Sequence, residues 1–153
     1  MDIKVQTEVF SLDELTRDLH AEDNSVGAVA TFVGYVRNIN QEKNVSSLFL
    51  EHYPGMTERS LQLIVDLANE RWLLQRVKIV HRVGFLGAGE PIVFVGVASE
   101  HRHTAFDACA FLMDFLKTRA PFWKREETKS GNHWVNSRES DRLAASRWAI
   151  NTK

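Results

Sequence analysis

Residues 91–117 read PIVFVGVASEHRHTAFDACAFLMDFLK and join a β-type segment to a helical one. The first ten residues are rich in β-branched and aromatic side chains, which favour a strand. The apolar residues that follow recur at helical spacing. They are Phe106, Cys109, Ala110, Met113 and Leu116. Because Phe111, Leu112 and Phe115 widen this stripe, we predict a helix over 103–117 that is buried on more than one side.

The rest of the chain mixes strand patterns with helix patterns. Strand patterns occupy residues 3–10, 26–37, 47–53, 77–84, 122–128 and 134–139, and helix patterns occupy 11–20, 57–72 and 140–148. Several strands are joined by short turns, which favours an α+β fold. At 153 residues the chain is expected to form one domain, 1–153.

Two segments carry more specific expectations. The strand at 26–37 has apolar residues on both of its alternating sets, so we expect it to be covered on both faces. It ends at Arg37, and the polar, aperiodic residues 38–46 that follow predict a mobile loop.

The composition excludes several classes of protein. A formal net charge of −1 argues against a general binder of nucleic acids or membrane surfaces. No CxxC or HExxH spacing occurs, so we expect no metal site and no bound cofactor. The one cysteine, Cys109, lies on the apolar helix stripe and is expected in the core. The chain shows neither a secretory signal nor a membrane-spanning run, so we expect a cytoplasmic protein.

The stretch LKTRAPFWKRE, residues 116–126, concentrates positive charge. One interpretation is structural, since cations are favoured at helix C-termini and strand neighbours of opposite charge can neutralise each other. The other is a rigid anion site, because Pro121, Phe122 and Trp123 are expected to anchor the segment in the core. If Lys117 and Lys124 approach each other, each lowers the pKa of the other, and a lysine can then act as nucleophile or base.

Two weaker candidates lie elsewhere. His101 and Arg102 follow a buried strand at the start of a helix, where backbone N–H groups favour anions. The commoner explanation of a lone histidine is structural: Ser99 or His103 caps the helix and His101 is a solvated turn residue. Arg37 ends a strand, as many solvated arginines do. Glu51 and His52 are adjacent strand residues that point to opposite faces, so we expect a structural role for them.

Six segments in this order closely resemble the large, catalytic subunits of molybdopterin synthase. They are TFVGYVRN, LEHYPGMTE, HRVGFLGAGEPIVFVGV, SEHRHTAFDA, DFLKTRAPFWKRE and WVNSRESD, within residues 25–148. The resemblance implies an α/β-hammerhead fold with an additional antiparallel β subdomain. It also implies a sulfurtransferase of molybdenum cofactor biosynthesis, which inserts sulfur into cyclic pyranopterin monophosphate (precursor Z) to form the dithiolene of molybdopterin.

The resemblance further implies partners. The sulfur donor is a small ubiquitin-like subunit whose C-terminal Gly-Gly ends in a thiocarboxylate, and the large subunit forms a homodimer within a heterotetramer. A phosphate and a thiocarboxylate must then share one pocket, and cations are needed to offset their repulsion.

Residue roles follow from the same resemblance. Lys117 matches the principal catalytic lysine, which acts as a general acid/base or as a transient covalent acceptor of the partner's tail. Lys124 matches a second essential lysine, which holds the thiocarboxylate. The implied substrate-binding residues are Tyr35, Val36, Arg37, His101, Arg102, Lys117, Lys124, Arg125 and Glu126, with Arg138 reaching a neighbouring subunit's pocket. Two alternatives stay open: a non-catalytic scaffold for a ubiquitin-like tail, and a phosphate-binding module, against which the lack of a glycine-rich loop counts.

Overall fold

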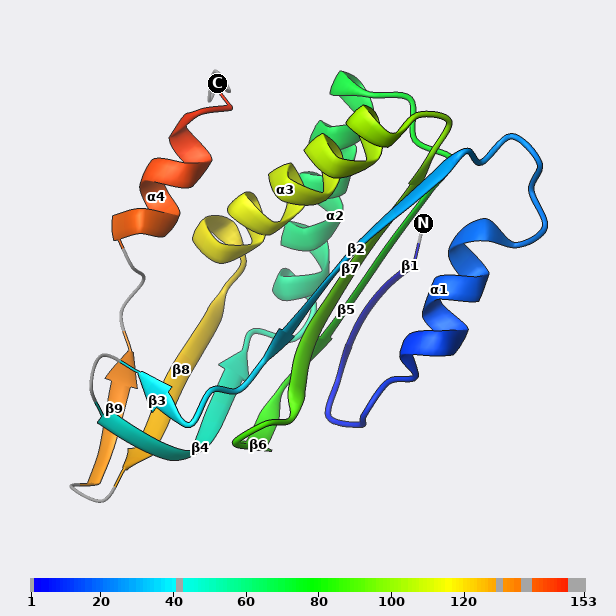
Figure 1. Ribbon diagram of the computed structural model, residues 1–153. Helices are drawn as coiled ribbons and strands as arrows, with labels where there is room; N and C mark the ends of the chain where they lie inside the picture. Colours follow the sequence, from blue (N-terminus) through cyan, green and yellow to red (C-terminus); the bar gives the residue numbers. More distant parts are fainter. Residues whose placement is uncertain (1, 41–42, 129–130, 136–138, 149–153) are drawn as a thin grey trace.

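The computed structural model describes residues 2–40, 43–128, 131–135 and 139–148. Helices and strands are interspersed along the chain (Figure 1). In chain order they are β1 (Asp2–Gln6), α1 (Leu12–His20), β2 (Ala28–Tyr35), β3 (Ile39–Asn40), β4 (Lys43–His52), α2 (Met56–Arg71), β5 (Arg76–Arg82), β6 (Gly84–Gly87), β7 (Pro91–Ser99), α3 (Arg102–Arg119), β8 (Phe122–Thr128), β9 (Gly131–Val135) and α4 (Glu139–Ser146). None of the helices in these ranges is long and apolar enough to cross a membrane.

The first sheet has four strands in the order β1-β5-β7-β2. β1 runs parallel to β5, and the other neighbours are antiparallel. Helices α2 and α3 cover one face of this sheet and α1 covers the other (Figure 1). Because the two central strands are covered on both faces, β5 and β7 are buried along almost their whole length and supply much of the core.

Helix α3 has the predicted position and burial. It ends at Arg119, two residues before Pro121, because proline cannot continue a helix. Its buried residues are Ala105, Ala108, Cys109, Phe111, Leu112, Met113, Phe115 and Leu116. The helix packs against β7, β2, α2 and α4, so burial on more than one side is confirmed. The inclusion of Phe106 in the buried stripe was wrong, since this side chain is 66% exposed.

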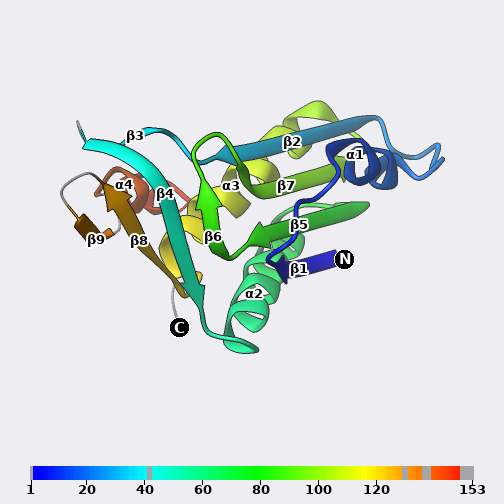
Figure 2. The same ribbon diagram turned by 90° about the horizontal axis from the view of Figure 1, so that it is seen from below.

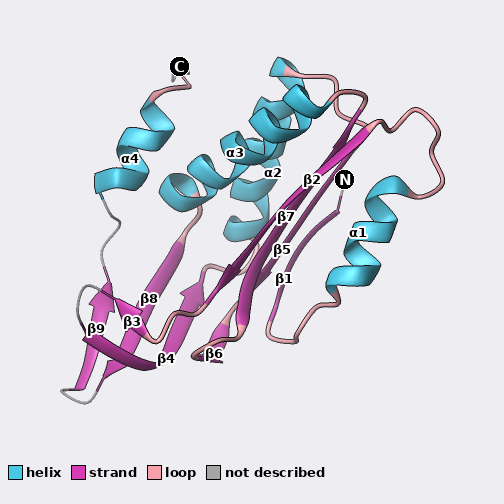
Figure 3. Ribbon diagram, in the orientation of Figure 1, coloured by secondary structure: helices cyan, strands magenta, loops and turns pink. Residues whose placement is uncertain are grey.

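The second sheet is antiparallel and lies beyond one end of the first (Figures 2 and 3). Its strands follow the order β3-β4-β8-β9, and β6 also pairs with β4. The α+β class with an additional antiparallel unit is therefore confirmed.

The predicted loop at 38–46 was wrong for most of its length. β3 lies within this segment and β4 begins there, with Ile39 opposite Asn44 and Asn40 opposite Lys43. Residues 41 and 42 lie outside the described residues. Polar side chains suggested a loop, yet strand pairing uses backbone groups that every residue except proline possesses.

Strand β2 lies at an edge of the first sheet, and the prediction that it is covered on both faces was wrong for this chain. Phe32 is 40% exposed and Tyr35 is 50% exposed. The alternation of apolar residues shows which side chains avoid water. It does not show whether another element packs on each face of the strand, because tertiary packing decides that.

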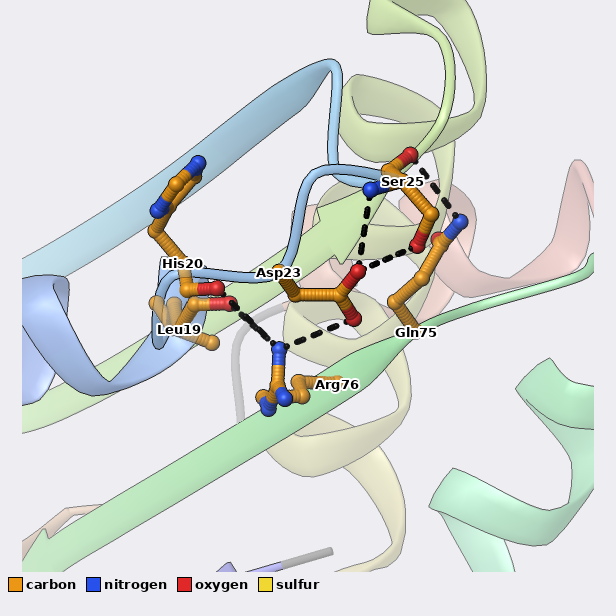
Figure 4. Close-up of polar contacts among 6 residues, drawn as sticks. All are labelled: Leu19, His20, Asp23, Ser25, Gln75 and Arg76. Carbon is orange, nitrogen blue, oxygen red and sulfur yellow. Dashed lines mark hydrogen bonds and ion pairs between the residues drawn. The ribbon is translucent and has the colours of Figure 1, made fainter.

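The connection from α1 to β2 is fixed by Asp23 (Figure 4). Its Oδ1 accepts hydrogen bonds from the Ser25 backbone N–H at 2.9 Å and from the Ser25 hydroxyl at 2.6 Å. Arg76 on β5 lies 3.4 Å from Oδ2 and also donates to the carbonyl of His20. The Ser25 hydroxyl, above all, holds the pKa of Asp23 below its usual range. These contacts set the point at which β2 enters the sheet.

The C-terminal helix α4 is tied to α3 through Trp148. The indole Nε1 donates to Asp114 Oδ2 at 2.7 Å, and the Trp148 carbonyl accepts a 2.8 Å hydrogen bond from Arg71 of α2. The ring packs edge-on against Trp72 and Phe111. This contact lies three residues before Lys117 and therefore steadies the last part of α3.

Replacing Trp148 with Phe should weaken this attachment. A hydrogen bond to a charged group contributes about 1.5–3 kcal/mol, so the free energy of unfolding in urea should fall by about 2 kcal/mol. The control is Arg147→Ala, which removes the 3.0 Å ion pair of a largely exposed side chain with the same Asp114. That change should cost less than about 1 kcal/mol. Equal losses in the two variants would contradict a special role for the indole.

Candidate active site

Two lysines flank the junction between α3 and β8. Lys117 lies in the last turn of α3 and is exposed, whereas Lys124 is the third residue of β8 and is half-buried. Between them, Ala120 adopts an extended conformation, as expected of a residue before proline. β8 then pairs with β4, which places Lys124 opposite Leu50. The chain thus passes from helix to strand in a defined direction.

A buried imidazole, that of His81 on β5, lies at this junction. The residue is only 5% exposed, and its ring stacks on Phe122, with ring centroids 3.9 Å apart and an angle of 19° between the planes. His81 Nδ1 lies 2.8 Å from the carbonyl oxygen of Arg82. Because a carbonyl only accepts hydrogen bonds, Nδ1 carries the proton and Nε2 keeps its lone pair.

The electrostatics of His81 involve both lysines. Burial, above all, lowers the pKa of His81 to about 3, although the hydrogen bond to Arg82 opposes this effect. The positive charges of Lys124 and Lys117 act in the same direction as burial, and His52 adds a smaller contribution. Charges act on a titrating group in this way only at short range. Both lysines therefore lie within electrostatic range of one neutral ring.

Arg125 and Glu126 continue β8. The guanidinium carbon of Arg125 lies 4.8 Å from the centre of the Phe49 ring, and Phe49 contacts Phe85 at 4.5 Å. The backbone of Glu126 pairs with β4 and β9. The side chain of Glu126 and the whole of Arg138 lie outside the described part of the chain.

Tyr35, Val36 and Arg37 lie where β2 ends. Val36 is buried, and its backbone N–H and carbonyl are both hydrogen-bonded to the turn before β7. Tyr35 and Arg37, one on each side of it, are exposed. Both β2 and α3 run opposite to β7 (Figure 1). Arg37 and Lys117 therefore lie toward the same end of the first sheet.

His101 and Arg102 lie at the other end of α3. His101 is the N-cap residue, Arg102 begins the helix, and both side chains are exposed. A helix rises about 1.5 Å per residue, so the backbone of Arg102 is about 22 Å from that of Lys117 along the axis. A single chain therefore does not bring this pair to the lysines.

Sequence reasoning missed His81 and misplaced Trp123. The segment 77–84 was interpreted only as a strand, and nothing local marks its histidine as a neighbour of residues 117 and 124. Trp123 is 48% exposed, so its predicted role as a core anchor was wrong. Adjacent strand residues point to opposite sides, so only one of Phe122 and Trp123 faces the core. The core position of Cys109 is confirmed, and burial raises the pKa of its thiol to about 11.

The buried His81 predicts a loss of stability in acid. Its pKa in the folded protein, about 3, lies below the usual 6.5, so the unfolded state binds a proton first as the pH falls. Stability from this group is full above about pH 6.5 and is lost toward about pH 3. His81→Phe keeps a stacking ring but cannot titrate. In urea unfolding between about pH 7 and about pH 4.5, its stability should fall less than that of the unmodified protein.

His20→Gln is the matched control, because the His20 side chain is exposed on α1. This variant should lose stability with falling pH as the unmodified protein does. An identical pH dependence in His81→Phe and in the unmodified protein would show that His81 does not titrate in this way.

Comparison with known proteins identifies the family. A model of the MoaE protein family matches residues 5–119. The molybdopterin synthase catalytic subunit of Pseudomonas aeruginosa is 55% identical over 148 residues, which cover 97% of this chain and 99% of that protein. The Vibrio cholerae protein of the same name is 55% identical over 146 residues, with 95% and 97% covered. The solved molybdopterin biosynthesis MoaE protein from Burkholderia ambifaria has a TM-score of 0.84 at 45% identity, covering 98% of this chain and 99% of that one. This chain belongs to the MoaE family.

Proposed function

We propose that this chain is the catalytic subunit of a molybdopterin synthase, an enzyme of molybdenum cofactor biosynthesis. It transfers sulfur from the C-terminal thiocarboxylate of a small ubiquitin-like subunit to cyclic pyranopterin monophosphate. The product is the dithiolene of molybdopterin. Membership of the MoaE family supports this assignment, because relatives named as this catalytic subunit match almost the whole chain at 55% identity.

The observation that carries the proposal is the placement of Lys117 and Lys124 on the two sides of the α3–β8 junction, where the buried His81 ring stacks on Phe122. The reaction brings a phosphate and a thiocarboxylate together. Two like charges 4 Å apart repel by about 4 kcal/mol at an effective dielectric constant of about 20. Two ammonium groups at fixed positions offset this repulsion without reorganisation during the reaction.

The two lysines divide the work in this proposal. Lys124, half-buried on a paired strand, holds the thiocarboxylate. Lys117, exposed at the end of α3, transfers protons or captures the tail while sulfur leaves the carbonyl carbon. For each sulfur, the C–S bond of the tail is broken and a C–S bond forms at a side-chain carbon of the pterin, where it replaces a C–O bond whose oxygen leaves. Water supplies the oxygen that restores the carboxylate of the tail. His81 remains neutral and adds no third charge.

The pterin and its phosphate are assigned to the residues around this pair. Arg37 follows the end of β2 and would bind the phosphate, with Tyr35 beside it. Arg125 and Glu126 extend the Lys124 segment of β8. Arginine suits this task because its guanidinium can donate two parallel hydrogen bonds to a phosphate.

His101 and Arg102 can join the site only from a second copy of the chain. Their separation of about 22 Å from Lys117 exceeds the reach of one small substrate. A homodimer that sets the start of one α3 beside the end of the other would supply them in trans. Arg138 is assigned to the same contribution from a neighbouring subunit.

Lys117→Ala tests the function directly. Conversion of precursor Z by the complex with a thiocarboxylated small subunit should fall by about 10²–10⁴-fold, the range for loss of a general acid or base. Binding of the small subunit, measured by size-exclusion chromatography, should persist. Lys4→Ala, at an exposed position of β1, is the matched control and should retain activity.

The outcomes separate the alternatives. If the unmodified complex converts precursor Z and the Lys117→Ala variant keeps that activity, Lys117 is not a catalytic residue. A complex that forms yet never yields dithiolene, even with the unmodified chain, would instead support a non-catalytic scaffold for a ubiquitin-like tail.

A further inference from the structure

A four-residue turn, Gly87–Glu90, contacts the segment that carries Arg37. The turn is closed by a 3.1 Å hydrogen bond from the Glu90 N–H to the Gly87 carbonyl. Gly89 occupies its third position with φ of +86°, a conformation that side-chain-bearing residues rarely adopt. The turn therefore has a defined shape that its sequence supports.

Two backbone hydrogen bonds join this turn to Val36. The Val36 N–H donates to the Glu90 carbonyl at 2.9 Å, and the Gly89 N–H donates to the Val36 carbonyl at 2.7 Å. The Val36 side chain is buried against Leu48 and Leu86. Val36 is thus held on three sides, and Arg37 is the first residue beyond this attachment.

The Glu90 side chain fixes the turn from within. One carboxylate oxygen accepts a hydrogen bond from the Gly87 N–H, and the other lies 3.5 Å from the Arg82 guanidinium. Arg82 is only 5% exposed and also donates to the carbonyls of Thr7 and Pro91 at 3.0 Å each. A buried guanidinium with several acceptors has little freedom to move, so the turn is attached to a rigid part of the core.

The geometry points to Glu90 as a positioning residue for Arg37: its carboxylate, held by Arg82, fixes the turn that sets the backbone of Val36 and so directs the Arg37 guanidinium toward the substrate phosphate. This inference rests on the proposed function, in which Arg37 binds that phosphate. Glu90 itself touches no substrate. Its contribution is preorganisation, because an arginine held in place loses less freedom on binding.

A double-mutant cycle tests the inference, with precursor Z as the varied substrate and the thiocarboxylated small subunit present. Arg37→Ala should raise KM about 10-fold or more, as expected for loss of a hydrogen bond to a charged group. Glu90→Ala should raise KM about 3- to 10-fold and leave kcat within about twofold. In the Arg37→Ala background the same change should raise KM less than about twofold, because residues acting through one contact are not additive.

Two further variants make the test specific. Glu90→Gln keeps an acceptor for the Gly87 N–H but turns an amide NH2 toward the Arg82 guanidinium, so it should recover only part of the affinity that Glu90→Ala loses. Glu70→Ala changes an exposed glutamate on α2 and should leave KM and kcat unchanged. Circular dichroism of each variant verifies that it is folded.

The possible failures are distinguishable. Full additivity of Arg37→Ala and Glu90→Ala, or a fall in kcat with unchanged KM in Glu90→Ala, would overturn the positioning role and leave the proposed function intact. If Arg37→Ala leaves KM unchanged, Arg37 does not bind the phosphate, and this inference fails with that assignment. If the unmodified complex converts no precursor Z, the proposed function fails first.

Discussion

The stack of His81 on Phe122 is the contact on which the candidate site depends, because it joins the two sheets. His81 belongs to β5 of the first sheet, and Phe122 opens β8 of the second. This contact lies two residues before Lys124, and it adds to the α3–β8 junction and the β4–β8 pairing that place Lys124 relative to Lys117. The ring fits here only in its neutral form, since burying a charged imidazole beside two ammonium groups would cost several kcal/mol.

The next residue, Arg82, links the His81–Phe122 contact to the end of β2. Its backbone carbonyl holds the His81 ring, and its side chain holds Glu90 and the neighbouring backbone. The cations of the candidate site thus lie on or directly after three elements: Arg37 after β2, Lys117 on α3 and Lys124 on β8. Each element has its own contacts with the rest of the fold.

Local patterns predicted the elements well and their surroundings less well. The helical spacing of apolar residues and the stop at Pro121 located α3, because both effects act within a few residues. The exposure of Phe106 and Trp123, and the edge position of β2, were not predictable in the same way. Each depends on whether another element lies against that side chain, and side-chain pattern alone carries no information on the neighbour.

The sequence by itself determined the mixture of helices and strands, the cluster of cations around Pro121 and, through resemblance, the family. Only the tertiary structure decided which residues from distant segments lie near one another. It brought His81, far from the lysines in the chain, to their side, because β5 and β8 meet where the two sheets join. It also kept His101 and Arg102 about 22 Å from Lys117, because a rigid helix separates its two ends by a distance that its length dictates.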